Sequence, residues 1–253
     1  MKRLFVFLSI SMVVVLLTSC ESRNSHTSLN EERKNPLVEY LQQYKGKDYN
    51  VGNSIQRDEL WQEREDGLVV LQDSVGVFNN LKGHINNITA RDVRDSKVVE
   101  FWVEIKPENY FEITLECSHI VHKDSLESDS LYQIVKGLSN YSTVYVDGAI
   151  AVTSKCKAAN ASWGDKDLQF SYPHYKFNVV ALSTSPLPKV SDNVQNAIVI
   201  WRRSFEGILK NGKSAETDEN IASFKNATEN LTPEEDAYIG KYVHACSLDL
   251  FRD

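Results

Sequence analysis

The sequence lacks the short signatures of common catalytic sites. It contains no Gly-x-Ser-x-Gly and no His-Glu-x-x-His, and the Gly-Lys-Ser at residues 212–214 lacks the upstream glycine of a phosphate-binding loop. Alternating glutamates between Glu100 and Glu116 could supply paired carboxylates for glycoside chemistry. Such spacing on a strand is more typical of a solvated charged face. We therefore expect no enzymatic activity, no catalytic residue and no cofactor.

Cysteine and closely spaced histidine are also scarce. The 253 residues include four cysteines and no Cys-x-x-Cys, and the closest histidines, His119 and His122, would point to opposite faces of a strand. We therefore expect no metal site. Apart from Cys20, the cysteines are Cys117, Cys156 and Cys246. Three cysteines in an oxidising compartment predict one disulfide and one buried thiol. The sequence does not indicate which two of the three form the disulfide.

Positive charge is in short supply. Lys and Arg total 28 against 35 Asp and Glu, a net charge of −7, which becomes −9 without Lys2 and Arg3 in the first 19 residues. Nucleic-acid binding depends on basic residues that neutralise phosphates. The charge balance therefore predicts that the protein does not bind nucleic acid.

Long hydrophobic runs are absent except at the N-terminus, where an apolar run extends from Leu4 to Leu17 after two basic residues. A membrane-spanning helix needs about 20 apolar residues, so the pattern favours a secretory signal over residues 1–19. The next residues, Leu17-Thr18-Ser19-Cys20, resemble the lipobox of bacterial lipoproteins. The resemblance implies cleavage before Cys20, attachment of diacylglycerol to its thiol and acylation of its new amino group, with palmitate among the acyl chains. An ordinary signal followed by a chance cysteine is the alternative.

A lipid anchor implies a protein of the bacterial cell envelope, in the outer membrane, with the membrane as a partner. The polar residues 20–35 would form a flexible tether. An N-terminal helical segment, residues 36–74, would follow it. This segment contains a short amphipathic helix at Pro36–Tyr44 and a second short helix within Ile55–Val70.

Between residues 75 and 188 apolar residues recur at every second position, which predicts strands. A helix capped by Asp129 or Ser130 and closed by Asn140 interrupts them. The first strand would bend at Gly83. The expected strands are Val75–Ile88, Val98–Ile105, Phe111–Ile120, Thr143–Thr153 and Tyr175–Leu182. The expected core residues are Phe101, Val103, Ile113, Leu115, Val146 and Ile150.

A C-terminal helical extension, residues 189–253, completes the chain, with helices expected at Val194–Leu209, Asn220–Ala227 and Thr232–His244. Three strands, a helix and two strands is the order of the oligonucleotide/oligosaccharide-binding (OB) fold. Residues 75–188 resemble the OB domains of bacterial lipoproteins related to the tRNA-anticodon-binding barrel. The resemblance rests on this order and on Gly83 and Gly148. It implies a mainly β protein with helical flanks (α+β), built on a five-stranded OB-like β-barrel with a helix between strands three and four. A half-barrel with an added helix would give the same pattern.

The outward positions of strands two and three suggest a ligand face, because OB domains bind ligands there. Trp102 and Tyr110 could stack on a ligand, beside the carboxylates of Glu104 and Glu112. Alternatively, Trp102 packs beneath the terminal helices. The sequence thus predicts a non-catalytic binding or scaffolding protein, with an envelope protein or a glycan as its possible partner. The alternative function is a binding module for a small glycan or peptide.

Overall fold

The computed structural model describes residues 35–47, 52–153, 157–161, 168–212 and 215–248. The expected signal, the tether to residue 34, Cys20 and Cys156 lie outside the described residues. None of the described helices has the length and apolar character needed to cross a membrane.

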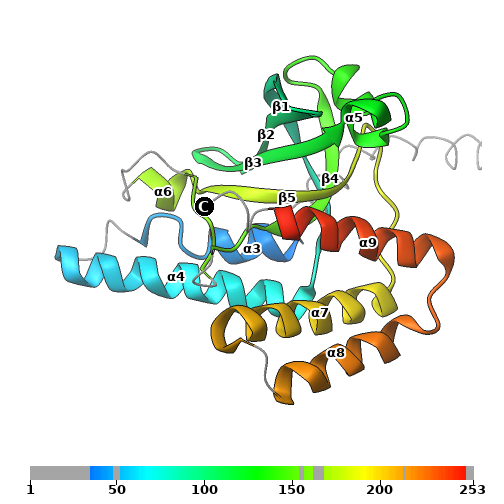
Figure 1. The fold of residues 1–253 in the computed structure, drawn as a ribbon. Helices are drawn as coiled ribbons and strands as arrows, with labels where there is room; N and C mark the ends of the chain where they lie inside the picture. The colour runs from blue at the N-terminus through cyan, green and yellow to red at the C-terminus, as the bar shows by residue number, and fades with distance from the viewer. Residues whose placement is uncertain (1–34, 48–51, 154–156, 162–167, 213–214, 249–253) are drawn as a thin grey trace, which may run out of the picture.

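Five strands close into a barrel in the order β1-β2-β3-β5-β4 (Figure 1). Neighbouring strands are antiparallel except β3 and β5, which are parallel. Helix α5 (Ser130–Lys136) lies between β3 and β4, and Asp129 caps it by accepting a hydrogen bond from the Tyr132 N–H. The predicted OB-like barrel and the predicted cap are therefore confirmed. The strands are β1 (Phe78–Val93), β2 (Ser96–Glu108), β3 (Phe111–His122), β4 (Thr143–Ile150) and β5 (His174–Ser183).

Alternation along the strands fills the barrel as the sequence predicts. All six expected core residues are at most 2% exposed. Gly148 permits a close contact between β4 and β5, because a Cβ there would lie 2.2 Å from the Asn178 carbonyl oxygen. Gly83 is also closely packed, because a Cβ added there would lie 2.7 Å from the Glu104 carbonyl oxygen. The sequence predicts that the first strand bends at Gly83. The register shifts of β1 lie elsewhere, between residues 78 and 81 and between residues 86 and 89.

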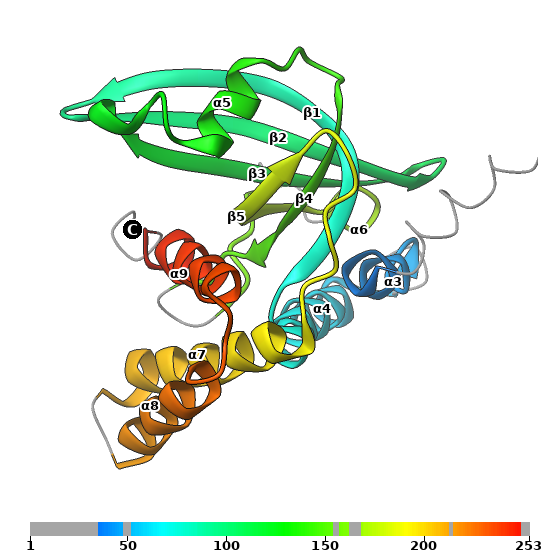
Figure 2. The same ribbon diagram turned by 90° about the vertical axis from the view of Figure 1, so that its right-hand side faces the viewer.

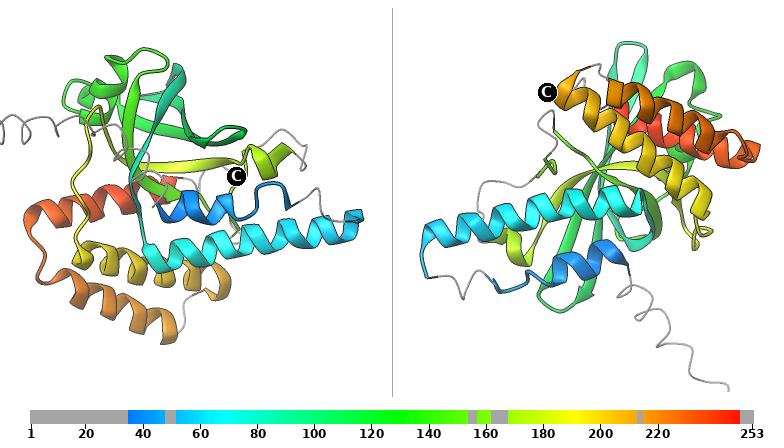
Figure 3. Two further views of the ribbon diagram at one scale, coloured as in Figure 1. Left: turned by 180° about the vertical axis from the view of Figure 1, so that it is seen from behind. Right: turned by 90° about the horizontal axis from the view of Figure 1, so that it is seen from below.

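The helices form a layer beneath the barrel, and α9 lies between β5 and α7 (Figures 1 and 2). Figure 3 shows α3 alongside α4. The second helix, α4, runs for 22 residues and is far longer than the sequence predicts. The short α6 lies between β4 and β5, where the sequence predicts no helix. These helices are α3 (Pro36–Gln42), α4 (Ser54–Val75), α6 (Leu168–Ser171), α7 (Asp192–Asn211), α8 (Ala215–Thr228) and α9 (Pro233–Leu248).

Polar side chains join the helical layer to the barrel. The Gln72 side chain of α4 donates to the Ile150 C=O at 2.9 Å and accepts from the Ile150 N–H at 2.6 Å. The buried guanidinium of Arg202 in α7 contacts Asp73 of α4 at 2.8 Å and the Tyr242 hydroxyl of α9 at 3.5 Å. The barrel therefore sits on a helical layer that is itself fixed by buried polar contacts.

Candidate functional site

The predicted ligand face is partly formed. Trp102 is half-buried, and its aromatic neighbour is His174 of β5, with ring centroids 5.3 Å apart in an edge-on arrangement. This neighbour belongs to the barrel, whereas the sequence suggested the terminal helices as the packing partner. Burial lowers the pKa of His174, because desolvation disfavours the imidazolium. The His174 Nε2 lies 3.6 Å from a carboxylate oxygen of Glu116.

The glutamates of this face are not a simple solvated row. Glu104 is buried, and it accepts a hydrogen bond from Asn86 Nδ2 at 3.1 Å. The Lys106 ammonium contacts Glu104 at 3.2 Å and Glu112 at 2.9 Å, and these carboxylates raise the pKa of Lys106. A lysine thus bridges two carboxylates whose repulsion would otherwise oppose their approach.

Tyr110 does not join Trp102 in one platform. It is 83% exposed, and it lies in the β2–β3 turn with a φ of 62°. The strand from Trp102 to Glu108, six residues and about 20 Å at the rise of a β-strand, separates Trp102 from the turn that holds Tyr110. The structure therefore brings together Trp102, Glu104 and Glu112 and leaves Tyr110 apart.

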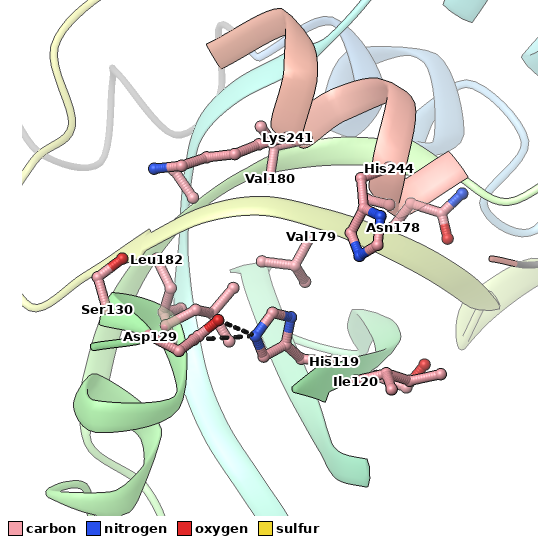
Figure 4. A pocket seen from close by; sticks show the side chains of 14 residues that line it. His119, Ile120, Asp129, Ser130, Asn178, Val179, Val180, Leu182, Lys241 and His244 are labelled. Atoms are coloured by element: carbon pink, nitrogen blue, oxygen red, sulfur yellow. Dashed lines mark hydrogen bonds and ion pairs between the residues drawn. The ribbon is translucent and has the colours of Figure 1, made fainter. Parts of the chain in front are cut away.

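A cavity of about 220 Å³ opens where the barrel seam parts (Figure 4). β3 and β5 pair over residues 114–117 and 174–177, and the cavity lies against the residues that follow in each strand. The start of α5 and one face of α9 complete its walls. We call this space, lined by Ser118–Ile120, Asp129–Leu131, Asn178–Leu182, Lys241, His244 and Ala245, the seam cavity.

A histidine–aspartate pair forms one wall of the seam cavity. His119 Nε2 lies 2.9 Å and 3.0 Å from the two carboxylate oxygens of Asp129. Because the same carboxylate caps α5, one aspartate both starts the helix and orients the imidazole. The other ring nitrogen of His119 faces away from Asp129 (Figure 4).

The opposite wall comes from α9. Lys241 and His244 are exposed and lie three residues apart, so that they share one helical face. Within the described part of the chain, neither side chain forms an ion pair or a hydrogen bond. The seam cavity therefore holds cationic or donor groups that no protein group neutralises there.

Asn178 lies at the back of the same cavity. It is 8% exposed, and its side-chain amide has no hydrogen-bond partner among the residues that the structure describes. Asn178 and Ser118 also line a neighbouring cavity of about 260 Å³ on the outer barrel face, together with Glu100, Glu116 and Lys176.

The cysteines correct one expectation. Cys117 and Cys246 are buried thiols, and neither belongs to a disulfide. Burial raises the pKa of the Cys117 thiol, which disfavours the reactive thiolate. No group of three or more His, Cys, Asp or Glu side chains in the described ranges could hold a metal ion.

Sequence reasoning missed the residues of the seam cavity. It considered His119 only for its spacing from His122, and Asp129 only as a helix cap. Lys241 and His244 share a helical face, which was a usable signal, but Asn178 carries none. The alternation does not show that β3 and β5 part beyond residues 117 and 177.

Comparison of the chain with protein-family models, with curated proteins and with solved structures found no match.

Proposed function

We propose that this protein is a non-catalytic binding module of the bacterial cell envelope, anchored by a lipid on Cys20, and that its ligand enters the seam cavity. The lipobox-like residues 17–20 support the anchor. The observation that carries the binding function is the seam cavity itself. It is an opening in the wall of a closed barrel, lined by His119, Lys241, His244 and the unpartnered amide of Asn178. Convergent polar groups in a concave site are typical of ligand binding.

Binding is favoured over catalysis by the surroundings of His119. Nucleophilic catalysis requires a hydroxyl or thiol in hydrogen-bond contact with the base. In the described residues, the contacts of the His119 ring are those with Asp129, and no serine, threonine or cysteine is hydrogen-bonded to it. The buried thiol of Cys117 is also a poor nucleophile, since burial raises its pKa.

The anchor is tested by cell fractionation of Cys20→Ala, with Cys246→Ala as the matched control for loss of a thiol. The wild type and the control should be in the membrane fraction, and both should incorporate labelled palmitate. Cys20→Ala should lose the label and remain an unprocessed precursor. Palmitate labelling of Cys20→Ala at the wild-type level would overturn the anchor.

The ligand site is tested by substituting Ala245→Phe, which places a ring in the mouth of the seam cavity. Ala222→Phe on the exposed face of α8 is the matched control. Isothermal titration with a panel of monosaccharides, hexuronic acids, inorganic phosphate and tripeptides would identify a binder. Ala245→Phe should weaken that binder by about tenfold or more, a loss of about 1.4 kcal/mol, and Ala222→Phe should not. Binding that Ala245→Phe leaves unchanged would refute the seam cavity as the site.

The outer barrel face is the second candidate, for a small glycan or peptide. The half-buried Trp102, held edge-on by His174 beside the Lys106-bridged carboxylates, favours it. In the same titrations, Trp102→Leu would weaken ligand binding and Ala245→Phe would leave it unchanged if the ligand binds on this face.

A further inference from the structure

We infer that the seam cavity is built for an oxyanion, a carboxylate or phosphate group of a small polar ligand. The inference rests on the proposed function of this cavity as the ligand site, and adds the chemistry of what it takes. It begins with local charge. The protein as a whole is acidic, with a net charge of −7, yet three of the four ionisable side chains in the cavity wall are basic: His119, Lys241 and His244.

The single acid of the wall is already engaged. Both carboxylate oxygens of Asp129 contact His119 Nε2, and one of them also accepts the Tyr132 N–H at 2.8 Å. An acceptor with these partners has little capacity left for the basic groups across the cavity. Asp129 is therefore engaged with His119 and the start of α5, and it forms no ion pair with Lys241 among the described residues.

Lys241 and His244 supply the groups that an oxyanion needs. A lysine ammonium has three donors and no acceptor, and a histidine ring offers at least one N–H donor. Hydrogen bonds from charged donors to carboxylate or phosphate oxygens are stronger than neutral ones. Figure 4 shows His244 extending from α9 toward the side of the cavity where His119 lies. The rings of His244 and His119 thus face each other across the cavity, and the Lys241 side chain extends from α9 toward the side where Ser130 and Leu182 lie (Figure 4).

Asn178 indicates that the ligand carries more than charge. Its side-chain amide has both a donor and an acceptor, neither is used by the described residues, and both remain open to solvent, where a ligand could reach them. A hydroxyl next to the anionic group would accept from and donate to this amide, as the hydroxyls of an acid sugar can.

The size of the cavity fits such a group. Its volume of about 220 Å³ is below the range of about 300–1,000 Å³ that is typical of sites for drug-sized ligands. The neighbouring cavity of about 260 Å³ shares Ser118 and Asn178 with it, and it adds two basic and two acidic side chains, Arg91, Lys176, Glu100 and Glu116. An oxyanion in the seam cavity would therefore have room for a polar remainder along the outer face.

The test is titration calorimetry of the full chain in uncharged detergent micelles with three probes: inorganic phosphate, D-glucuronate and D-glucose. We expect D-glucuronate or phosphate to bind at least about tenfold more tightly than neutral D-glucose. Removing two charge-assisted donors with Lys241→Gln and His244→Gln should weaken the anion by about tenfold or more. Lys225→Gln on α8 removes an equal charge away from the cavity and should change the affinity by less than about twofold.

Three results would overturn the inference. D-glucose could bind as tightly as D-glucuronate and be lost on Ala245→Phe, in which case the cavity is a ligand site but not one for anions. Lys225→Gln could weaken the anion as much as the α9 variants do, in which case general charge attracts it. The third result is that phosphate and D-glucuronate both fail to bind at millimolar concentration. By contrast, anion binding that survives Ala245→Phe would refute the proposed site itself. A shared loss of the phosphate and D-glucuronate affinities on Lys241→Gln would show that either source of the oxyanion is accepted.

Discussion

At the scale of single residues, alternation along β2 decides burial. Phe101 is fully buried in the barrel, and its neighbour Trp102 is half-buried on the outer face. Phe101→Ala should destabilise the protein by about 3–5 kcal/mol, because it leaves a cavity in a packed core. Trp102→Ala should cost less. Urea unfolding of both variants tests this, and a larger loss at Trp102 would show that the ring on the outer face is the better packed of the two.

His174 should make stability depend on pH. Burial lowers its pKa from the ordinary 6.5, so the unfolded state takes up a proton at a higher pH than the folded state does. The stabilising contribution is therefore present above 6.5 and is lost as pH falls through the folded pKa. Urea midpoints at about pH 7.5 and about pH 5.5 should differ less for His174→Gln than for the wild type. His84→Gln, which alters an exposed histidine, should retain the wild-type difference.

At the scale of elements, α4 shows why one helix was predicted far too short. The residues that α4 buries include Arg64, Glu65 and Gln72 besides Leu68, so its buried side has no continuous apolar stripe. Periodicity arguments depend on such a stripe. Arg64 and Glu65 form an ion pair at 2.9 Å, and Tyr175 of β5 donates to Glu65 at 2.8 Å. Tyr175 lies 110 residues from Glu65 in the chain, and Gln169, whose C=O accepts from Arg64 at 2.7 Å, lies 105 residues from Arg64. The helix pattern alone cannot indicate such partners.

The contact between α4 and β4 can be tested at Gln72. Its amide pairs with the backbone N–H and C=O of Ile150 at the end of β4, as a neighbouring strand would. Gln72→Leu would leave both buried groups without a partner, each at a cost of about 1–3 kcal/mol. We expect a total loss of about 2–6 kcal/mol in urea unfolding. Gln62→Leu on the exposed side of α4 is the control, and an equal loss there would argue against the pairing.

Other elements were predictable because their signals are local. Asp129 caps α5 as expected, and α7 covers the helix expected at Val194–Leu209 and ends at Gly212, which has a φ of 68°. Thr232 and Glu235 form a reciprocal capping box at the start of α9, with hydrogen bonds of 3.2 Å and 3.0 Å. Caps and turns depend on residues within a few positions of one another, and the sequence displays those directly.

At the scale of the whole molecule, we expect no nucleic-acid binding at physiological salt. The net charge is −7, and the outer barrel face carries Glu100, Glu104, Glu112 and Glu116. Fluorescence titration with labelled single-stranded DNA and RNA at about 150 mM salt should give no saturable signal. Micromolar binding that weakens steeply with added salt would contradict the expectation, and would show that the basic groups near the seam accept phosphates of a polymer.

The sequence by itself determined the order of strands and helices, the faces that fill the barrel, and the acidic balance of the chain. These follow from local periodicity, from caps and from composition, which need no knowledge of distant residues. Only the tertiary structure decided where β3 and β5 part, and that α9 lies beside this opening. It therefore decided that His119, Asn178 and His244 share one cavity. The physical reason is that strand pairing and helix docking join residues that are far apart in the chain. The local side-chain pattern of a strand or helix does not indicate which distant element it will contact.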